Sequence, residues 1–314
     1  MHKLILTFDI EDSINPNAIE ADCIILKMLD KYKLKALLFI TGHQAEKLSN
    51  YPEILDLINT HEVGFHSSSH SVRPLIPEFS DAYSYVEAHS ISLERETSHI
   101  NSLTGKKEGE GGIYFLQDLF PKKKIETFRA PGMSWTPPHL EALVDIGIKF
   151  DFSSNITNSE PIQYKKIIFY PYTFTQKWDG STHDYQCLLY AIMNHKVAIF
   201  DLHPTQIVNK NEWDNIYFKG NPTSLSYAQK RETNEVNSLF KKFENLLKLI
   251  NFLKNIRLIE VNTNLNSIPK DLIICKSDVQ KFYNMSVRWP KILFGYNPKY
   301  LAAHFDNFFE DAIQ

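Results

Sequence analysis

The sequence is poor in cysteine and contains no long uninterrupted apolar segment. Its 314 residues include three cysteines, an odd number that is too small for a disulfide framework. Cys23, Cys187 and Cys275 are therefore expected to be reduced core thiols. The longest apolar runs, such as Ala36–Ile40, fall far short of the roughly 18 residues that a membrane-spanning helix needs. No secretory leader is recognised either, because the first strand-like run already reaches acidic residues at Asp9. These absences predict a cytoplasmic protein without a membrane span.

The chain also lacks an excess of basic residues. It has 34 Lys and Arg against 37 Asp and Glu, for a net charge of −3. Because phosphate backbones select basic surfaces, this balance argues against nucleic acid as a partner. Apolar residues are plentiful, at 43% with 21 Phe and 15 Tyr, and are sufficient for a sizeable core. The composition is that of a soluble globular enzyme.

Short strand-like runs alternate with amphipathic helical segments over most of the chain. The expected strands are 3–8, 35–41, 62–65, 126–128, 148–152, 196–202 and 257–261, and the expected helices are 17–31, two within 44–60, 81–103, 137–146 and 227–254. This alternation predicts an α/β fold with a mostly parallel sheet or barrel and helices outside it. Residues 105–124 are interpreted as a surface insertion and residues 204–225 as an irregular loop. We expect one main domain over 1–265, followed by a helical C-terminal appendage over 266–314.

Two motifs at the ends of expected strands offer metal ligands. His66-Ser-Ser-Ser-His70 places two imidazoles four residues apart, which lets one helical turn present both to a metal ion. The alternative is a serine-rich loop with two solvated histidines. Thr7–Asp12 contains three carboxylates, which repel one another unless a cation or an arginine lies among them. Its alternative is an acidic helix N-terminus.

Two further motifs offer a cation and a proton donor. In Phe128-Arg129-Ala-Pro-Gly132, an arginine in a rigid turn can hold a carboxylate through two hydrogen bonds, or form an ordinary structural ion pair. In Phe200-Asp-Leu-His203-Pro, a histidine ends an apolar strand, where a single histidine is more often structural than catalytic. Folds of the α/β class place ligands at such strand ends.

In their order along the chain, these motifs resemble the five motifs of the polysaccharide deacetylase family, also described as carbohydrate esterase family 4 or the NodB-homology domain. The counterparts of the five motifs, in order, are residues 7–12, His66–His70, Arg129–Gly132, Gly147–Ser154 and Leu202–Pro204. The resemblance covers about residues 3–262. It implies a distorted (β/α) barrel with one divalent metal at the carboxyl ends of its strands. It also implies hydrolysis of the N-acetyl group of an amino sugar in a saccharide, or in some cases of an O-acetyl group.

The metal site implied by the resemblance consists of His66, His70 and one carboxylate. The family's usual first motif has the base and the metal ligand adjacent, whereas two residues separate Asp9 from Asp12 here. Strand alternation places Glu11 on the same side as Asp9, yet a bend at the strand end can bring Asp12 in. The spacing resembles a variant motif, Phe-Asp-x-Glu-Asp, and we favour Asp12 over Glu11. Zinc suits these ligands best, with Co²⁺, Fe²⁺, Ni²⁺ and Mn²⁺ left open.

The resemblance also implies the catalytic roles. Asp9 would be the general base that takes a proton from water, and Arg129 would orient Asp9 and keep it ionised. His203 would be the general acid that protonates the departing amine. Asp151 would hydrogen-bond His203 and favour its charged form.

Two residues would contact the substrate. A backbone N–H of Gly132 would bind the oxyanion, and Leu202 would wall a small pocket for the acetyl methyl. Aromatic side chains could also stack on a sugar ring. For Trp135 and Trp178, core packing is the favoured interpretation. For Trp213 and Tyr217, both interpretations stay open.

Because no leader is recognised, we expect a cytoplasmic substrate such as a nucleotide-linked or lipid-linked sugar or a glycan under assembly. One alternative is an amidohydrolase of the same fold that acts on a ureide or a cyclic imide. The other is a catalytically inactive saccharide-binding protein, which the presence of base, acid, arginine and both histidines disfavours. The sequence leaves the particular sugar and the oligomeric state open.

Overall fold

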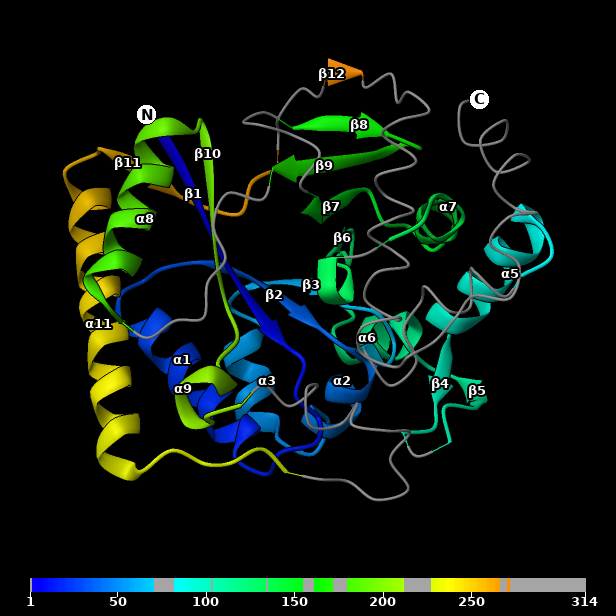
Figure 1. The fold of residues 1–314 in the computed structure, drawn as a ribbon, viewed down its shortest axis with the longest axis horizontal. Helices are drawn as coiled ribbons and strands as arrows, with labels where there is room; N and C mark the ends of the chain where they lie inside the picture. The colour runs from blue at the N-terminus through cyan, green and yellow to red at the C-terminus, as the bar shows by residue number, and fades with distance from the viewer. Residues whose placement is uncertain are drawn as a thin grey trace.

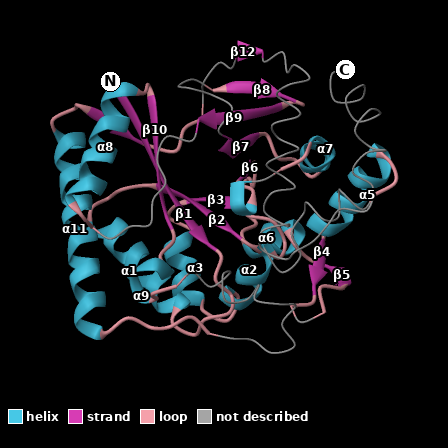
Figure 2. Ribbon diagram, viewed as in Figure 1, coloured by secondary structure: helices cyan, strands magenta, loops and turns pink. Residues whose placement is uncertain are grey.

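A computed structural model describes residues 2–70, 82–102, 104–133, 135–154, 161–171, 180–211, 227–265 and 270–271. Strands lie at the centre of the molecule and helices lie around them (Figures 1 and 2). Within the described residues, none of the helices is both long and apolar enough to cross a membrane. Cys23 and Cys187 are free and partly buried, and Cys275 lies outside the described residues.

The main sheet is almost entirely parallel. In spatial order its strands are β10 (Val197–Leu202), β1 (His2–Ile10), β2 (Ala36–Ile40), β3 (Glu62–Phe65), β6 (Thr127–Phe128), β7 (Phe150–Ser154), β9 (Ile167–Pro171), β8 (Ile162–Tyr164) and β12 (Lys270–Asp271). Among the described strands of this sheet, β8 and β9 form the one antiparallel pair. β11 (Ile259–Val261) pairs with β1 at His2–Leu4, before β2 begins its pairing at Leu6. The predicted α/β fold with a parallel sheet is confirmed. In the described part of the chain, no pairing joins β10 to β12 at the two ends of this order, so closure into a barrel is not seen among these strands.

The helices connect successive strands and cover the sheet. They are α1 (Ala18–Lys31), α2 (Gly42–Leu48), α3 (Pro52–Ile58), α5 (Tyr85–Glu96), α6 (Ile113–Leu119), α7 (Pro137–Asp145), α8 (Thr182–Asn194), α9 (Thr205–Val208) and α11 (Thr233–Asn255). In Figure 1, α8 and α11 lie on the left beside β1 and β10, and α5 and α7 lie on the right. A short 3-10 turn, η2 (Pro131–Met133), follows β6.

Alternation along β1 separates two apolar clusters and creates a polar row. The even-numbered residues of Leu4–Ile10 belong to the main core, which the helices cover. Ile5 belongs to a smaller inner cluster, which consists of Ile5, Leu37, Phe39, Phe152, Tyr170, Val197 and Ile199. The next residues on the side of Ile5 are polar, because side chains two apart in a strand share a face: Thr7, Asp9 and Glu11. The polar row therefore continues the face of β1 that carries Ile5, toward the carboxyl end of the strand and next to the inner cluster.

The structure differs from the expected elements between residues 81 and 124. The predicted helix 81–103 ends at Glu96, and the chain continues into an antiparallel hairpin of β4 (Ser98–Ile100) and β5 (Lys107–Glu110). The predicted surface insertion 105–124 is wrong in its second half, because α6 buries Ile113 and Leu116 in the main core. Gly112, with φ of 56°, makes the sharp turn into α6. The strands β8 and β9 and the helix α8 were missed by the sequence analysis.

Helix α1 buries an acidic side chain, and this gives a testable dependence of stability on pH. Burial is the largest influence on Asp22 and raises its pKa from 3.8 to about 8, although Gln44 Nε2 donates a hydrogen bond to its Oδ2 at 3.1 Å. The folded protein therefore keeps a proton that the unfolded chain releases above pH 3.8. Its contribution to the free energy of unfolding falls as pH rises from about 4 to about 8.

Asp22→Asn is expected to remove this dependence. The variant should be more stable than wild type at neutral pH by roughly 1–3 kcal/mol, and the difference should shrink toward pH 4. Denaturant unfolding at several pH values measures this effect. Asp56→Asn, which removes an exposed carboxylate on α3, is the matched control and should show no such trend. Parallel pH profiles for Asp22→Asn and wild type would contradict the expectation.

Candidate metal and catalytic site

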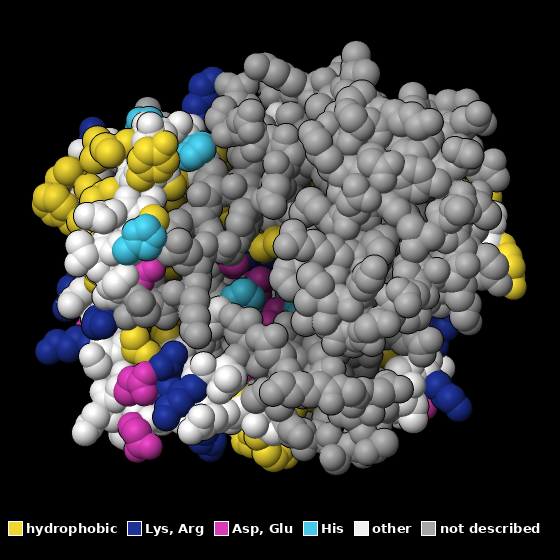
Figure 3. Space-filling model, viewed as in Figure 1, with side chains coloured by type: hydrophobic (Ala, Val, Ile, Leu, Met, Phe, Trp, Pro, Cys, Tyr) yellow, Lys and Arg dark blue, Asp and Glu magenta, His cyan; other side chains and the backbone are white. Residues whose placement is uncertain are grey.

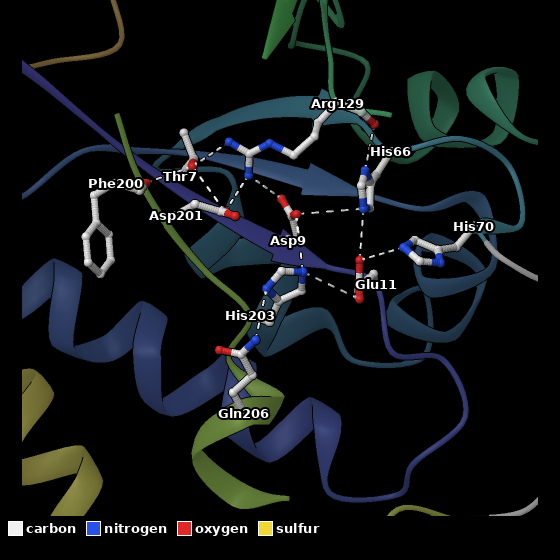
Figure 4. Close-up of polar contacts among 10 residues, drawn as sticks. All are labelled: Thr7, Asp9, Glu11, His66, His70, Arg129, Phe200, Asp201, His203 and Gln206. Atoms are coloured by element: carbon white, nitrogen blue, oxygen red, sulfur yellow. Dashed lines mark hydrogen bonds and ion pairs between the residues drawn. The ribbon is translucent and has the colours of Figure 1, made fainter. Parts of the chain in front are cut away.

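Polar side chains from four strand ends converge at one place above the inner cluster (Figure 4). They come from β1, from the segment after β3, from the residue after β6, and from the end of β10. In the space-filling view, acidic and histidine side chains are visible near the centre of the face shown (Figure 3). Convergence at the carboxyl ends of parallel strands is the arrangement that α/β folds use for ligands.

Glu11 lies between the two histidines of the His66–His70 motif. Its Oε2 is 2.8 Å from His66 Nε2 and 3.0 Å from His70 Nε2. The three side chains are buried, and one ligand atom from each lies within 4.8 Å of the others. Two imidazole nitrogens and one carboxylate oxygen are a donor set suited to a transition metal such as zinc. The three residues therefore fit a divalent cation.

The backbone at Arg129 determines which nitrogen of His66 faces the site. His66 Nδ1 lies 2.7 Å from the carbonyl oxygen of Arg129. A carbonyl oxygen only accepts hydrogen bonds, so Nδ1 carries the proton and donates it. Nε2 is therefore the nitrogen that faces Glu11: it donates a hydrogen bond when the ring is protonated, and in the neutral ring it would be free to bind a metal ion.

The charges of this cluster depend on one another. Burial alone would raise the pKa of Glu11, but the positive charges of His70 and His203 and hydrogen bonds from His66 and His70 hold it well below its usual value. Burial opposes protonation of His66, yet the negative charges of Asp9 and Glu11 raise its pKa overall. The ionised Glu11 thus attracts positive charge, which protons or a metal ion can supply.

Asp12, the carboxylate favoured from the sequence, points elsewhere. Its Oδ1 accepts hydrogen bonds from the backbone N–H groups of Ile14 at 3.1 Å and Asn15 at 2.9 Å. Its Oδ2 accepts a third from Asn15 Nδ2 at 2.8 Å. Both oxygens therefore stabilise the turn that follows β1. The geometry favours the alternative ligand, Glu11.

Asp9 is held by a fully buried arginine that also holds a second carboxylate. Arg129 Nη1 donates to Asp9 Oδ1 at 2.6 Å and also to Asp201 Oδ1. Arg129 Nη2 donates to Thr7 Oγ1 at 2.8 Å. The guanidinium lies over the ring of Phe39, 4.4 Å from its centroid. This fixes Arg129 above the inner cluster and leaves Asp9 Oδ2 directed at the histidines.

His203 completes the cluster from β10. Its Nε2 is 3.5 Å from Asp9 Oδ2 and 3.8 Å from Glu11 Oε1, and its side chain is 28% exposed, far more than either carboxylate. Gln206 Nε2 lies 3.5 Å from His203 Nδ1. An amide nitrogen only donates, so this contact favours a proton on Nε2, the nitrogen that faces Asp9.

Two residues predicted for the site lie differently. Both oxygens of Asp151 accept hydrogen bonds from Ser153, and burial raises the pKa of Asp151 to about 7. These contacts do not support the predicted bond from Asp151 to His203. Leu202 is fully buried in the main core, in register with Phe8. Because alternate residues of a strand face opposite sides, Leu202 points away from His203 and does not wall the site.

The other predicted residues are less informative. Gly132 lies in the exposed turn η2 with φ of 58°, a left-handed conformation that glycine adopts without strain. Trp135 is buried in the main core, with its ring 5.2 Å from that of Phe169, which fits the core interpretation. The remaining aromatic candidates lie outside the described residues, namely Trp178, Trp213 and Tyr217.

Asp201 is a site residue that the sequence analysis missed. It is buried, and its Oδ1 accepts from Arg129 and, at 3.3 Å, from Thr7 Oγ1. Burial raises its pKa, and the charge of Asp9 adds to this while Arg129 opposes it. Its position in the sequence could have identified it, because an acidic residue two positions before His203 in an apolar strand shares the face of that histidine.

A protein-family model described as polysaccharide deacetylase matches residues 2–150. Residues 2–150 are therefore similar to the polysaccharide deacetylase family. The match confirms the resemblance to that family over the segment that carries residues 7–12, His66–His70 and Arg129–Gly132. The matched segment carries Asp9, Glu11, His66, His70 and Arg129, and it ends before β10 supplies the rest of the cluster.

Several solved structures of polysaccharide deacetylases and relatives are similar to this chain at low identity. A family 4 carbohydrate esterase from Streptomyces lividans in complex with acetate has 11% identity and a TM-score of 0.44, with 86% of this chain and 98% of that chain covered. Peptidoglycan deacetylase PdaC from Bacillus subtilis has 16% identity and a TM-score of 0.36, with coverage of 93% and 95%. Wild-type BA3943, a CE4 family pseudoenzyme from Bacillus anthracis, has 14% identity and a TM-score of 0.39, with coverage of 79% and 61%, so this chain spans under two thirds of its length. At these scores the likenesses add nothing to the argument about the site. A search of curated proteins found no match.

Proposed function

We propose that this chain is a metal-dependent hydrolase that removes an N-acetyl group from an amino sugar. The observation that carries the proposal is the convergence of Glu11, His66 and His70 on one point beside Asp9 and His203. Metal-dependent amide hydrolysis requires metal ligands, a general base and a general acid that lie close to one another.

Glu11, His66 and His70 would hold the divalent cation, with zinc favoured by two nitrogen donors and one carboxylate. When bound, such a cation supplies Lewis-acid chemistry that lowers the pKa of water and polarises an amide carbonyl. We assign the carboxylate ligand to Glu11 because both oxygens of Asp12 accept hydrogen bonds from the turn that follows β1.

Asp9 is the proposed general base. Arg129 occupies its Oδ1 at 2.6 Å, which leaves Oδ2 to take a proton from the attacking water. The positive guanidinium favours the ionised carboxylate and fixes its orientation. Asp201 and Thr7 also contact this guanidinium, so the orientation of Asp9 rests on a network of side chains from different strands.

His203 is the proposed general acid. Its Nε2 faces the cluster and would deliver a proton to the departing amine, which is a poor leaving group unless protonated. The partial exposure of His203 allows a substrate to reach that nitrogen. The backbone N–H of Gly132, in the exposed turn after β6, is the proposed donor to the oxyanion that forms on the carbonyl.

The proposed substrate is an N-acetylated saccharide or glycan precursor in the cytoplasm. The proposed catalytic domain is 1–265, since β10 and β11 lie beyond the segment matched by the family. A helical appendage over 266–314 stays a prediction, as only residues 270–271 of that region are described.

Acetate release from a panel of N-acetylated sugars and oligosaccharides tests this function. Chelation is expected to lower the rate by at least about 10²-fold, because Lewis-acid stabilisation is worth several kcal/mol, and added Zn²⁺ or Co²⁺ should restore it. Undiminished acetate release after metal removal would overturn the proposal. Amine release only from ureides or cyclic imides would indicate a different amide substrate. Saccharide binding without turnover at any metal would indicate an inactive binding protein.

A further inference from the structure

The segment 66–70, which carries both histidines, rests on a buried polar network that the proposed reaction does not use. Glu96, the last residue of α5, is fully buried beneath this segment. Its Oε2 accepts from the backbone N–H of Ser68 at 2.9 Å, and its Oε1 accepts from Ser67 Oγ at 3.2 Å. His139 of α7 lies on the other side of the same carboxylate, with Nε2 3.1 Å from Oε1.

Arg95, the preceding residue, holds the second half of the segment. It is also fully buried, and its Nη2 donates to Ser69 Oγ at 2.5 Å and to the carbonyl oxygen of His70 at 3.3 Å. The carbonyl oxygen of Arg95 in turn accepts a hydrogen bond from Ser68 Oγ at 2.9 Å. Two consecutive residues of α5 therefore contact every residue from Ser67 to His70.

The backbone of the segment needs such support. Ser67 and His70 have φ of 67° and 49°, a left-handed conformation that non-glycine residues adopt at a cost of roughly 1 kcal/mol or more each. These turns bring the two imidazole rings to a centroid distance of 5.0 Å, with both Nε2 atoms on Glu11. Such a conformation persists only where its surroundings determine it.

The opposite side of the segment is packed just as closely. The backbone N–H groups of Gly42 and His43 donate to the carbonyl oxygens of Ser67 and Ser68, each at 3.0 Å. A Cβ atom at Gly112 would lie 2.1 Å from Ser68 Oγ and 2.2 Å from the carbonyl oxygen of Glu96. The segment is thus confined between α2, α5 and the turn before α6.

We propose that Arg95 and Glu96 are positioning residues for the metal site, which hold the segment 66–70 in the strained conformation that directs both histidines at Glu11. The inference rests on the proposed function, because it concerns the same cation. Their hydrogen bonds reach Ser67, Ser68, Ser69 and the backbone of His70 rather than the imidazole rings, so both residues act through the conformation of the segment.

Glu96→Gln is the first test. The amide places an N–H₂ group where the carboxylate accepts hydrogen bonds from Ser67, Ser68 and His139, so at least one donor loses its acceptor. The dissociation constant for Zn²⁺, measured by competition with a chromogenic chelator, is expected to rise by at least about tenfold, as for other residues that orient metal ligands. The visible absorption of the Co²⁺-loaded protein, which reports coordination geometry, is expected to change as well.

Glu94→Gln is the matched control. Glu94 lies on the same helix and receives the same chemical change, but its side chain is 60% exposed and pairs with Lys107. Its Zn²⁺ affinity and Co²⁺ spectrum are expected to match those of wild type. Circular dichroism and thermal unfolding of the metal-free proteins show whether each variant is folded before its affinity is compared.

A second variant keeps the inference testable if Glu96→Gln fails to fold. Ser67→Ala/Ser69→Ala removes one side-chain bond to each positioning residue and introduces no new donor. It is also expected to weaken Zn²⁺ binding by about tenfold. Binding within twofold of wild type in a folded Glu96→Gln protein, or in the serine double variant, would overturn the inference. Failure of wild type to bind either metal would overturn the proposed function and this inference together, whereas equal binding by wild type and variants overturns the inference alone.

Discussion

Glu11→Gln is expected to abolish stoichiometric metal binding, whereas Asp12→Asn is expected to leave it nearly unchanged. Glu11 Oε2 lies within 3.0 Å of both histidine Nε2 atoms, and an amide in its place offers a weaker neutral donor to the cation. Loss of one of three protein ligands should weaken affinity by more than the roughly 10–100-fold typical of residues that only orient ligands. Elemental analysis of protein purified without added metal, followed by Zn²⁺ titration, measures both variants.

The two variants form a matched pair, because each converts one acidic side chain of the same strand end into its amide. Asp12→Asn keeps an acceptor for the N–H groups of Ile14 and Asn15, so the turn after β1 should persist. The opposite pattern, with metal lost in Asp12→Asn and kept in Glu11→Gln, would return the ligand role to Asp12. Equal metal content in both would show that neither carboxylate is required.

Asp9→Asn is expected to lower kcat for acetate release by roughly 10²–10⁴-fold, the usual range for loss of a general base, with metal content unchanged. The amide oxygen of this variant would still accept a hydrogen bond from Arg129, whose guanidinium also stays paired with Asp201 and Thr7, so the fold around it should be preserved. Parallel measurement of kcat, KM and bound zinc separates loss of the base from loss of the metal.

For that comparison Asp12→Asn again serves as the control, since it should retain kcat within a few fold. A rate for Asp9→Asn within tenfold of wild type would remove Asp9 from the role of base. A loss of zinc in Asp9→Asn would instead indicate that its Oδ2, 3.8 Å from His66 Nε2, takes part in metal binding.

Local pattern was enough to predict most elements that position the site. The strands β1, β2, β3, β6 and β10 were predicted within two residues at each end, because each is a short apolar run that ends at polar residues. The errors lie where local pattern is ambiguous, as between residues 97 and 119, where polar hairpin strands and a short amphipathic helix together resemble one helix and a loop. Packing of β4 and α6 against α2 decides those residues.

The sequence by itself determined which residue types meet and on which strand ends, since Asp9, His66, Arg129 and His203 each lie at or just after the end of a strand that local pattern identifies. Only the tertiary structure decided which residues next to them in the sequence also face the cluster. Asp12 accepts hydrogen bonds within the turn that follows β1, and Leu202 packs in the main core, whereas Glu11 and Asp201 face the cluster. Arg95 and Glu96 reach the segment 66–70 from a helix more than twenty residues away, as separations of 26 and 28 residues show. Such contacts depend on where a helix packs in space, and the spacing of residues within one segment does not predict the position of a helix elsewhere in the chain.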